Sequence, residues 1–374
     1  MAMTPIDQDE VTPRTGQDRP ELQKAIEEIV ESGVVAGVQL HVHDERGAWA
    51  GSAGVRKLGE SAEPSVDGHF RIGSVTKTFT ATLVLQLVAE GVIGLDTPAD
   101  DYLPELGLDR RITVRMLLQH TSGVFNFTGE YYDDGSFAPG GVPGLGKEWV
   151  DSNRFRTYRP EELVRPALSK PPRFEPGTDW NYSNTNYVLA RLLVQKATGR
   201  SYAEEMQRLI LGPLGLTGTV VPEASPEIPE PHAHGYYGYE DSGQWKVVDT
   251  TDFNPSWISA AGDMISTAQD LHTFFSALNG GKLLPAGLLA EMRTPHPKVG
   301  YGLGVFVEET AGGTVLQHNG GFWGWAALMY STPDGSRTLT GSLTTGDAEL
   351  DLAAMSGAFE TVKQRLVTEV FCGG

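Results

Sequence analysis

The sequence has little cysteine and no long apolar segment. Its one cysteine, Cys372, lies two residues from the end of 374 residues, so no disulfide can form within the chain and the redox compartment stays open. No uninterrupted apolar run approaches the roughly 20 residues that span a bilayer. The first ten residues also lack the basic and apolar regions of a signal peptide. We therefore expect a cytoplasmic protein without a membrane partner, or a secreted one if the sequence is a trimmed mature form.

Basic residues are scarce as well. The chain has 29 Lys and Arg against 48 Asp and Glu, which gives a formal net charge of −19. Such a charge keeps a protein soluble and repels polyphosphate, so nucleic acid is not an expected partner. With 40% hydrophobic and 21% charged residues, the composition indicates a globular protein that is long enough for two core-forming units.

Both ends of the chain carry the patterns of one α/β unit. Amphipathic helices are predicted at 22–33 and from 352 to 366, where apolar residues share one helix face. Short alternating segments bounded by Gly, Pro and Asp predict strands at 38–42, 48–50, 301–307, 313–317, 322–330 and 337–344. We expect residues 1–18 to be a disordered lead-in. Residues 19–94 and 291–374 should form an α/β domain, an antiparallel sheet flanked by the N- and C-terminal helices.

The middle of the chain is mainly helical in pattern. Helices are predicted at 112–120, 160–168, 186–199, 202–211 and 267–278. We therefore expect a mainly helical domain, at 95–290, inserted into the sheet domain. Two long loops rich in Gly, Pro and aromatic residues, at 128–149 and 221–245, fit either lids or tolerated surface insertions.

A candidate nucleophile, Ser74, lies at the start of a predicted buried helix that runs to Gly91. Lys77 is three residues further on, so its amine can stand beside the Ser74 hydroxyl on the same helix face. The unpaired amides and the positive dipole end of the helix favour an anion there. A Ser-x-x-Lys spacing alone also fits a helix cap and a surface lysine. The catalytic interpretation depends on two later motifs, Tyr182-Ser183-Asn184 and His318-Asn319-Gly320.

The order Ser-x-x-Lys, Tyr-x-Asn, His-x-Gly across a split α/β domain resembles the serine penicillin-recognising family. This family includes class C β-lactamases, DD-peptidases, esterases and acyltransferases. The segments at 70–77, 118–123, 182–187 and 302–304 are similar to their family counterparts, and the resemblance covers the chain from about residue 20. It implies a β-lactamase/transpeptidase-like fold and an acyl-enzyme on the serine, without a cofactor.

The resemblance also implies roles for individual residues. Ser74 would be the nucleophile, and Tyr182 would protonate the leaving group and then activate the acceptor. The backbone amides of Ser74 and Gly321 would form the oxyanion hole. His318 would belong to the catalytic site, although a turn histidine satisfied by a carbonyl is the alternative. The residues implied in substrate binding are Asn184, Asn319, Gly320, Trp257 and Tyr132, of which the two aromatic residues could equally be ordinary core.

The Ser74 proton has two candidate acceptors. A free Lys titrates near 10.4 and a free Tyr near 10, so at pH 7 a neutral Lys77 costs about 4.6 kcal/mol and an ionised Tyr182 about 4 kcal/mol. Because these costs are nearly equal, we predict one proton shared by a coupled Lys77 and Tyr182 pair.

Phe306 departs from the resemblance. DD-carboxypeptidases carry an Arg on the strand after the Gly-Leu-Gly run, where it binds the substrate carboxylate, whereas this chain has Phe306 and no basic residue at 302–307. A carboxylate would lose a contact worth about 1.5–3 kcal/mol. We therefore predict an uncharged ester or amide donor, a small molecule or a peptide-like one, whose acyl group passes to water or to an amine. The protein would be a serine hydrolase or an ATP-independent, amide-forming transacylase, for example in antibiotic biosynthesis.

Other interpretations stay open. A D-Ala-D-Ala carboxypeptidase or a β-lactamase is the first alternative. A catalytically silent ligand-binding protein is the second, but it would be expected to lose Ser74, Lys77 or Tyr182, and all three are present. Two histidine pairs, His41 with His43 and His232 with His234, lack a third ligand at suitable spacing, so no metal site is predicted. The oligomeric state is not indicated.

Overall fold

The computed structural model describes residues 14–15, 19–132, 134–346 and 352–372. The predicted lead-in at 1–18 lies outside the described residues except for 14–15. Within these ranges, eight strands form one sheet in the order β1-β3-β2-β14-β13-β11-β10, and β12 pairs with β13. Neighbouring strands are antiparallel apart from β1 and β3. The strands are β1 (Arg14–Thr15), β2 (Val35–Asp44), β3 (Gly47–Gly54), β10 (Phe306–Thr310), β11 (Gly313–Gln317), β12 (Gly320–Phe322), β13 (Trp325–Ser331) and β14 (Thr338–Thr345).

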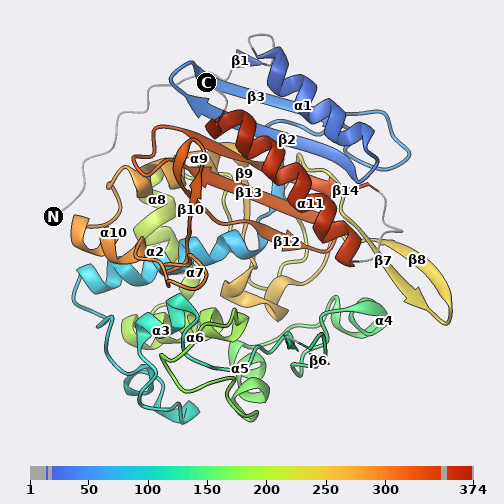
Figure 1. The fold of residues 1–374 in the computed structure, drawn as a ribbon. Coiled ribbons are helices and arrows are strands. Elements are labelled where there is room, and N and C mark those ends of the chain that lie inside the picture. The colour runs from blue at the N-terminus through green and yellow to red at the C-terminus, as the bar shows by residue number, and fades with distance from the viewer. Residues whose placement is uncertain (1–13, 16–18, 133, 347–351, 373–374) are drawn as a thin grey trace.

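Helices from the two ends of the chain, α1 (Pro20–Glu31) and α11 (Leu352–Val367), lie side by side over one face of this sheet (Figure 1). Leu22 and Ile26 of α1 share a buried cluster with Leu366 of α11 and with Leu40 and Val42 of β2. Helix α9 (Ala268–Asn279) packs on the opposite face, against β2, β13 and β14. The predicted antiparallel sheet with terminal helices is confirmed.

Helix α2 (Thr76–Ala89) is the centre of the fold because it is buried on almost every side. A helix whose residues are apolar or small all round can be enclosed in this way. Helices α3, α5 and α6 lie on the side of α2 away from the terminal helices (Figure 1). The remaining described α-helices are α3 (Val114–Gln119), α4 (Gly146–Glu148), α5 (Pro160–Leu168), α6 (Asn184–Thr198), α7 (Tyr202–Met206), α8 (Gly212–Leu214) and α10 (Ala286–Met292). None of the helices in the described part of the chain is long and apolar enough to cross a lipid bilayer.

Two predicted strands differ from the structure because glycine turns interrupt them. The chain at 301–305 forms no ladder, since Gly300 (φ +71°) and Gly304 (φ +78°) turn it, and Tyr301 makes only an isolated bridge to Phe306. The strand predicted at 322–330 is a hairpin of β12 and β13. Its turn contains Gly324 at φ +83°, a conformation that favours glycine.

The long segment at 221–245 is not wholly irregular. Its second part begins a hairpin of β7 (Tyr236–Asp241), which starts with two buried tyrosines, and the mainly exposed β8 (Gln244–Asp249). Positive φ angles at Ser242 and Gly243 suit a tight hairpin turn, and Ser-Gly between the two strands is the sequence signal for it. Two further strand pairs complete the described sheets: β4 (His69–Arg71) with β9 (Ile265–Thr267), and β5 (Glu130–Tyr131) with β6 (Phe137–Ala138). The predicted domain boundaries at 95 and 290 stay a prediction.

Three histidines meet where β2 faces α9: His41 is fully buried, and His43 and His272 are partly buried. The rings of His43 and His272 stack at 3.4 Å, and the centroid of His41 lies 6.3 Å from that of His43. Burial, reinforced by the neighbouring His41, lowers the pKa of His43 from 6.5 to about 4, although Asp44 acts in the opposite direction. Burial beside His43 lowers the pKa of His272 to about 3. These side chains are therefore neutral at neutral pH.

Acid should destabilise the fold through this cluster. The unfolded chain binds these protons more readily than the folded one, so the stabilisation is complete above pH 6.5 and is lost as the pH falls through 6.5 toward 4. For His43 this amounts to about 3 kcal/mol at about 1.36 kcal/mol per pKa unit. His43→Phe keeps an aromatic ring on His272, and we expect it to shift acid unfolding, followed by circular dichroism, to lower pH. His296→Phe, at a half-exposed site, is the control, and equal midpoints for both variants would contradict the prediction.

Candidate active site

Ser74 lies in a 3₁₀ turn, Gly73–Val75, which connects β4 to α2. It therefore directly precedes the α-helix, whereas the sequence placed it in the first α-helical turn. Strand β12 passes so close to this turn that a Cβ on Gly73 would lie 2.9 Å from the Gly321 nitrogen, and one on Gly320 would lie 1.8 Å from the Ile72 oxygen. Only glycine fits this contact, which sets β12 against the Ser74 backbone. The oxyanion hole of the Ser74 and Gly321 amides stays a prediction that this packing supports.

Polar residues from two of the three predicted motifs, Ser-x-x-Lys and Tyr-x-Asn, meet at Ser74. Tyr182 donates a hydrogen bond to Ser74 Oγ at 2.8 Å, and Lys77 Nζ lies 3.1 Å from the same oxygen. The Lys77 amine also contacts Asn184 Oδ1 at 2.8 Å and the Ala261 carbonyl oxygen at 2.6 Å. Tyr182 precedes α6, whose first residue is Asn184, so one short segment supplies both of these side chains.

Burial determines the protonation of this group. Lys77 is fully buried, and burial lowers its pKa well below the ordinary lysine value. Burial raises the pKa of Tyr182. Among the described residues, no carboxylate contacts the Lys77 amine. The free-energy costs of a neutral Lys77 and an ionised Tyr182, which were nearly equal for free side chains, therefore differ in the folded protein. A neutral Lys77 is favoured, while an ionised Tyr182 is disfavoured.

The hydrogen-bond partners of the Lys77 amine suit its neutral form. Its two N–H groups can donate to Asn184 and to the Ala261 carbonyl, which leaves the nitrogen lone pair facing the Ser74 hydroxyl. Tyr182 at the same time donates to Ser74 Oγ. The arrangement can take the hydroxyl proton from Ser74 onto Lys77 and can return a proton from Tyr182 to a leaving group.

The Ala261 carbonyl was not found by sequence reasoning, and a buried loop holds it in place. In the 3₁₀ turn Ser259–Ala261, Ser259 has a positive φ of 51° and accepts hydrogen bonds from the amides of Gly262 and Asp263, both at 2.9 Å. Arg191 lies 3.2 Å from the Ser259 hydroxyl and 3.5 Å from Asp263 Oδ2. Burial raises the pKa of Asp263 to about 6. A strained residue and a buried ion pair thus fix this part of the site.

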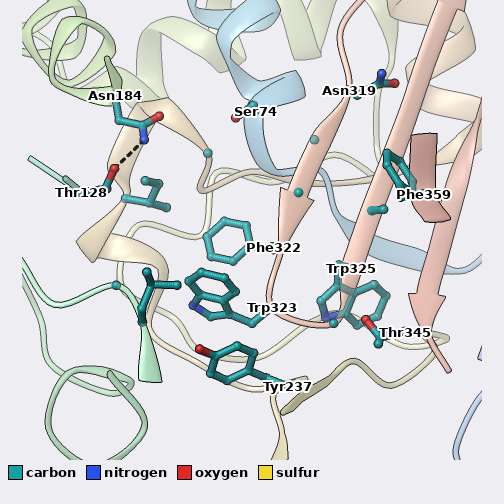
Figure 2. A pocket seen from close by; sticks show the side chains of 18 of the residues that line it. Ser74, Thr128, Asn184, Tyr237, Asn319, Phe322, Trp323, Trp325, Thr345 and Phe359 are labelled. Carbon is teal, nitrogen blue, oxygen red and sulfur yellow. Dashed lines mark hydrogen bonds between the residues drawn. The ribbon is translucent and has the colours of Figure 1, made fainter. Parts of the chain in front are cut away.

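Asn184 is held from the other side by Asn126, Thr128 and Glu130, none of which the sequence analysis singled out. Its Nδ2 donates to Thr128 Oγ1 at 3.1 Å (Figure 2). Asn126 Oδ1 accepts from both the Asn184 amide and the Thr128 hydroxyl, each at 3.1 Å. Buried Glu130 accepts from the Asn126 amide at 2.8 Å and from Asn181 Nδ2 at 3.0 Å. These residues carry no periodic pattern, so no sequence signal marked them.

His318 lies outside the hydrogen-bonded group around Ser74. It is 2% exposed, its Nδ1 contacts the Asn319 carbonyl at 2.8 Å, and its Nε2 is 3.3 Å from the Tyr301 hydroxyl. Burial, with Lys77 nearby, lowers its pKa to about 3, so it supplies no positive charge at neutral pH. These contacts match the alternative of a turn histidine satisfied by a carbonyl. Phe306 packs against the rings of both Tyr301 and His318 and, like His318, is absent from the lining of the cavity described next.

Ser74 opens into a cavity of about 600 Å³ with largely apolar walls, to which eight aromatic side chains contribute. Phe322, Trp323 and Tyr237 follow one another below Ser74, and Trp325 and Phe359 lie to one side of this column (Figure 2). The predicted Asn184, Trp257, Asn319, Gly320 and Gly321 also line it, whereas Tyr132 does not. Side chains alternate along an extended chain, so Tyr131 faces the cavity and Tyr132 packs on Arg173 at 4.0 Å.

The lining contains no Lys, Arg, Asp or Glu among the described residues. The same part of the chain contains no group of three His, Cys, Asp or Glu side chains placed to hold a metal ion.

Comparison with known proteins agrees with this site. The family model described as Beta-lactamase matches residues 22–355. A D-stereospecific amidohydrolase from Streptomyces sp. has a similar structure, with a TM-score of 0.81 and 37% identity over 96% of this chain and 99% of that chain. An antiparallel sheet with an enclosed Ser, Lys and Tyr group therefore defines a serine hydrolase of the penicillin-binding type. The chain belongs to the β-lactamase family.

Curated relatives show a range of activities in this family. Penicillin-binding protein 4* of Bacillus subtilis (strain 168) is 26% identical over 336 residues, which are 86% of this chain and 70% of that protein. Esterase EstB of Burkholderia gladioli is 29% identical over 303 residues, 69% of this chain and 72% of its own. Two further relatives are longer, and the chain spans 53% and 48% of their lengths.

Removing the Lys77 amine should slow the reaction at Ser74 without unfolding the protein. In Lys77→Met the site stays filled and uncharged, so we expect a folded protein whose Ser74 acylation is slowed by about 10²–10⁴-fold. In the wild type, acylation requires neutral Lys77, so its rate should fall with decreasing pH along a limb that lies well below 10.5. Stopped-flow labelling by a fluorescent fluorophosphonate measures both effects, with Lys282→Met as an exposed control. A limb near the ordinary lysine pKa would contradict the assignment.

Proposed function

We propose that the protein cleaves an uncharged amide or ester by transferring its acyl group to Ser74 and then to water. The observation that supports this most is the position of the Ser74, Lys77 and Tyr182 group at a cavity whose described lining is aromatic and uncharged. Apolar walls with a few polar groups near one reactive atom are typical of small-molecule sites.

The relatives support both bond types. One is an amidohydrolase with D stereospecificity and another is an esterase. We infer a D-configured donor, with its carbonyl at Ser74 and an aromatic or large aliphatic side chain on the wall of Phe322, Trp323 and Trp257. Neither a free carboxylate nor a free ammonium group meets an opposite charge in the lining, so the donor should be blocked at both ends.

The reaction then follows from the contacts. Ser74 Oγ attacks the carbonyl carbon as its proton moves to Lys77, and the Ser74 and Gly321 amides hold the oxyanion. Loss of one such donor typically costs about 2.7–4 kcal/mol of transition-state stabilisation. Tyr182 protonates the leaving oxygen or nitrogen, and the Lys77 ammonium, whose Nζ lies 4.7 Å from the centroid of the Tyr182 ring, balances the charge of the resulting phenolate. Water then attacks the acyl-enzyme with the same groups acting in reverse, and Ser74 is released.

An amine is the second candidate acceptor, which would make the protein a transacylase of the kind used in natural-product biosynthesis. The cavity favours it because its lining continues to Trp325, Thr345 and Phe359, which offers apolar room for a second organic group (Figure 2). A D-Ala-D-Ala carboxypeptidase or β-lactamase activity is less favoured, since the lining offers a substrate carboxylate no basic partner.

The donor preference tests the proposal. We expect N-acetyl-D-phenylalanine methyl ester to be cleaved with a kcat/KM about ten- to hundredfold above that of a D-Ala-D-Ala peptide with a free carboxylate, which corresponds to the about 1.5–3 kcal/mol of a missing charged contact. Mass spectrometry of the trapped intermediate should place the acyl group on Ser74, with none on Ser74→Ala. Adding amines shows whether amide products form. A higher kcat/KM for the free carboxylate would refute the proposal.

A further inference from the structure

Two aromatic side chains on the hairpin of β5 and β6 stand exposed at the edge of the cavity. Tyr131 is 66% exposed and Phe137 is 42% exposed, and their ring centroids are 4.8 Å apart. Both line the cavity that contains Ser74. Large apolar side chains that are paired and exposed beside a functional cavity usually mark a binding surface.

The base of this hairpin is fixed to the active site. Glu130 is 3% exposed and holds the Asn126 amide, and Asn126 in turn holds Asn184, which contacts Lys77. The Phe137 ring packs directly on Gly129, where φ is +109° and a Cβ would lie 2.3 Å from the ring. The position of the aromatic pair relative to Ser74 is therefore set by buried contacts.

The hairpin of β5 and β6 and the inner aromatic wall, formed by Phe322 and Trp323, lie on different sides of Ser74 and belong to different elements. Phe322 and Trp323 directly follow Gly321, on the oxyanion side of Ser74. Tyr131 follows the Asn126 to Glu130 segment, whose Thr128 contacts Asn184 on the other side (Figure 2). A donor with only one apolar group can cover the inner wall, but it leaves the hairpin rings in water.

We propose that Tyr131 and Phe137 form a second apolar subsite, which makes the preferred donor a peptide-like chain with two hydrophobic groups. This inference rests on the proposed function and deepens it. One group lies on the inner wall next to the reactive carbonyl. The second, beyond an amide bond on the amino side, covers the paired rings of the hairpin. An uncharged amide bond in the donor also suits this cavity, because none of the described residues that line it is charged.

The test compares a short with an extended donor. The short donor is N-acetyl-D-phenylalanine methyl ester, and the extended donor carries a leucyl residue between the acetyl group and the D-phenylalanine. In the wild type we expect kcat/KM for the extended donor to exceed that for the short donor about tenfold, mainly through a lower KM. In Tyr131→Ala/Phe137→Ala the ratio should fall toward one, whereas Phe155→Ala, which removes a ring that is 58% exposed and outside the cavity lining, should keep the wild-type ratio.

The outcomes separate this inference from the proposed function. A wild-type ratio near one, or an unchanged ratio in the double variant, would overturn the subsite while short-donor cleavage still supports the proposed function. If neither ester acylates Ser74 although a fluorophosphonate labels it, the proposed function fails, and the subsite fails with it.

Discussion

The burial of the Lys77 amine is the constraint on which the rest of the site depends. An amine without a carboxylate partner among the described residues is held at the centre of the protein by Ser74, Asn184 and the Ala261 carbonyl. Such a group is costly to keep charged in a low-dielectric interior, so it is poised as a base. The surrounding structure supports this arrangement through fixed polar contacts, namely the Asn126 and Glu130 segment on one side and the Ser259 to Asp263 loop on the other.

Charged side chains are also absent from the described lining of the cavity. A chain with a formal charge of −19 places no charged side chain among the described residues that line this space. The described lining offers a bound donor no charged partner, which is the basis of the proposed uncharged donor. The same lining joins Ser74 to the apolar side chains of β12 and of the β5 and β6 hairpin.

Much of the fold and the centre of the site could be predicted from the sequence. Alternation marked the strands of the sheet, and the motifs around Ser74, Lys77 and Tyr182 specified chemistry that does not depend on exact element boundaries. The Ala261 carbonyl could not be found, because a backbone oxygen has no side-chain signature. The family resemblance implied Tyr132, but Tyr131 lines the cavity, because neighbouring side chains of an extended chain point to opposite faces. His318 fits a charged or a neutral role equally well by sequence, and only its burial separates the two.

The central claim is that Lys77 is neutral when Ser74 reacts. The most direct measurement is an NMR pH titration of the protein with isotopically labelled lysine side chains, with the Lys77 signal assigned by its loss in Lys77→Met. The account predicts that this signal titrates well below the ordinary lysine range, apart from the signals of exposed lysines. A Lys77 signal that titrates together with the exposed lysines would contradict it.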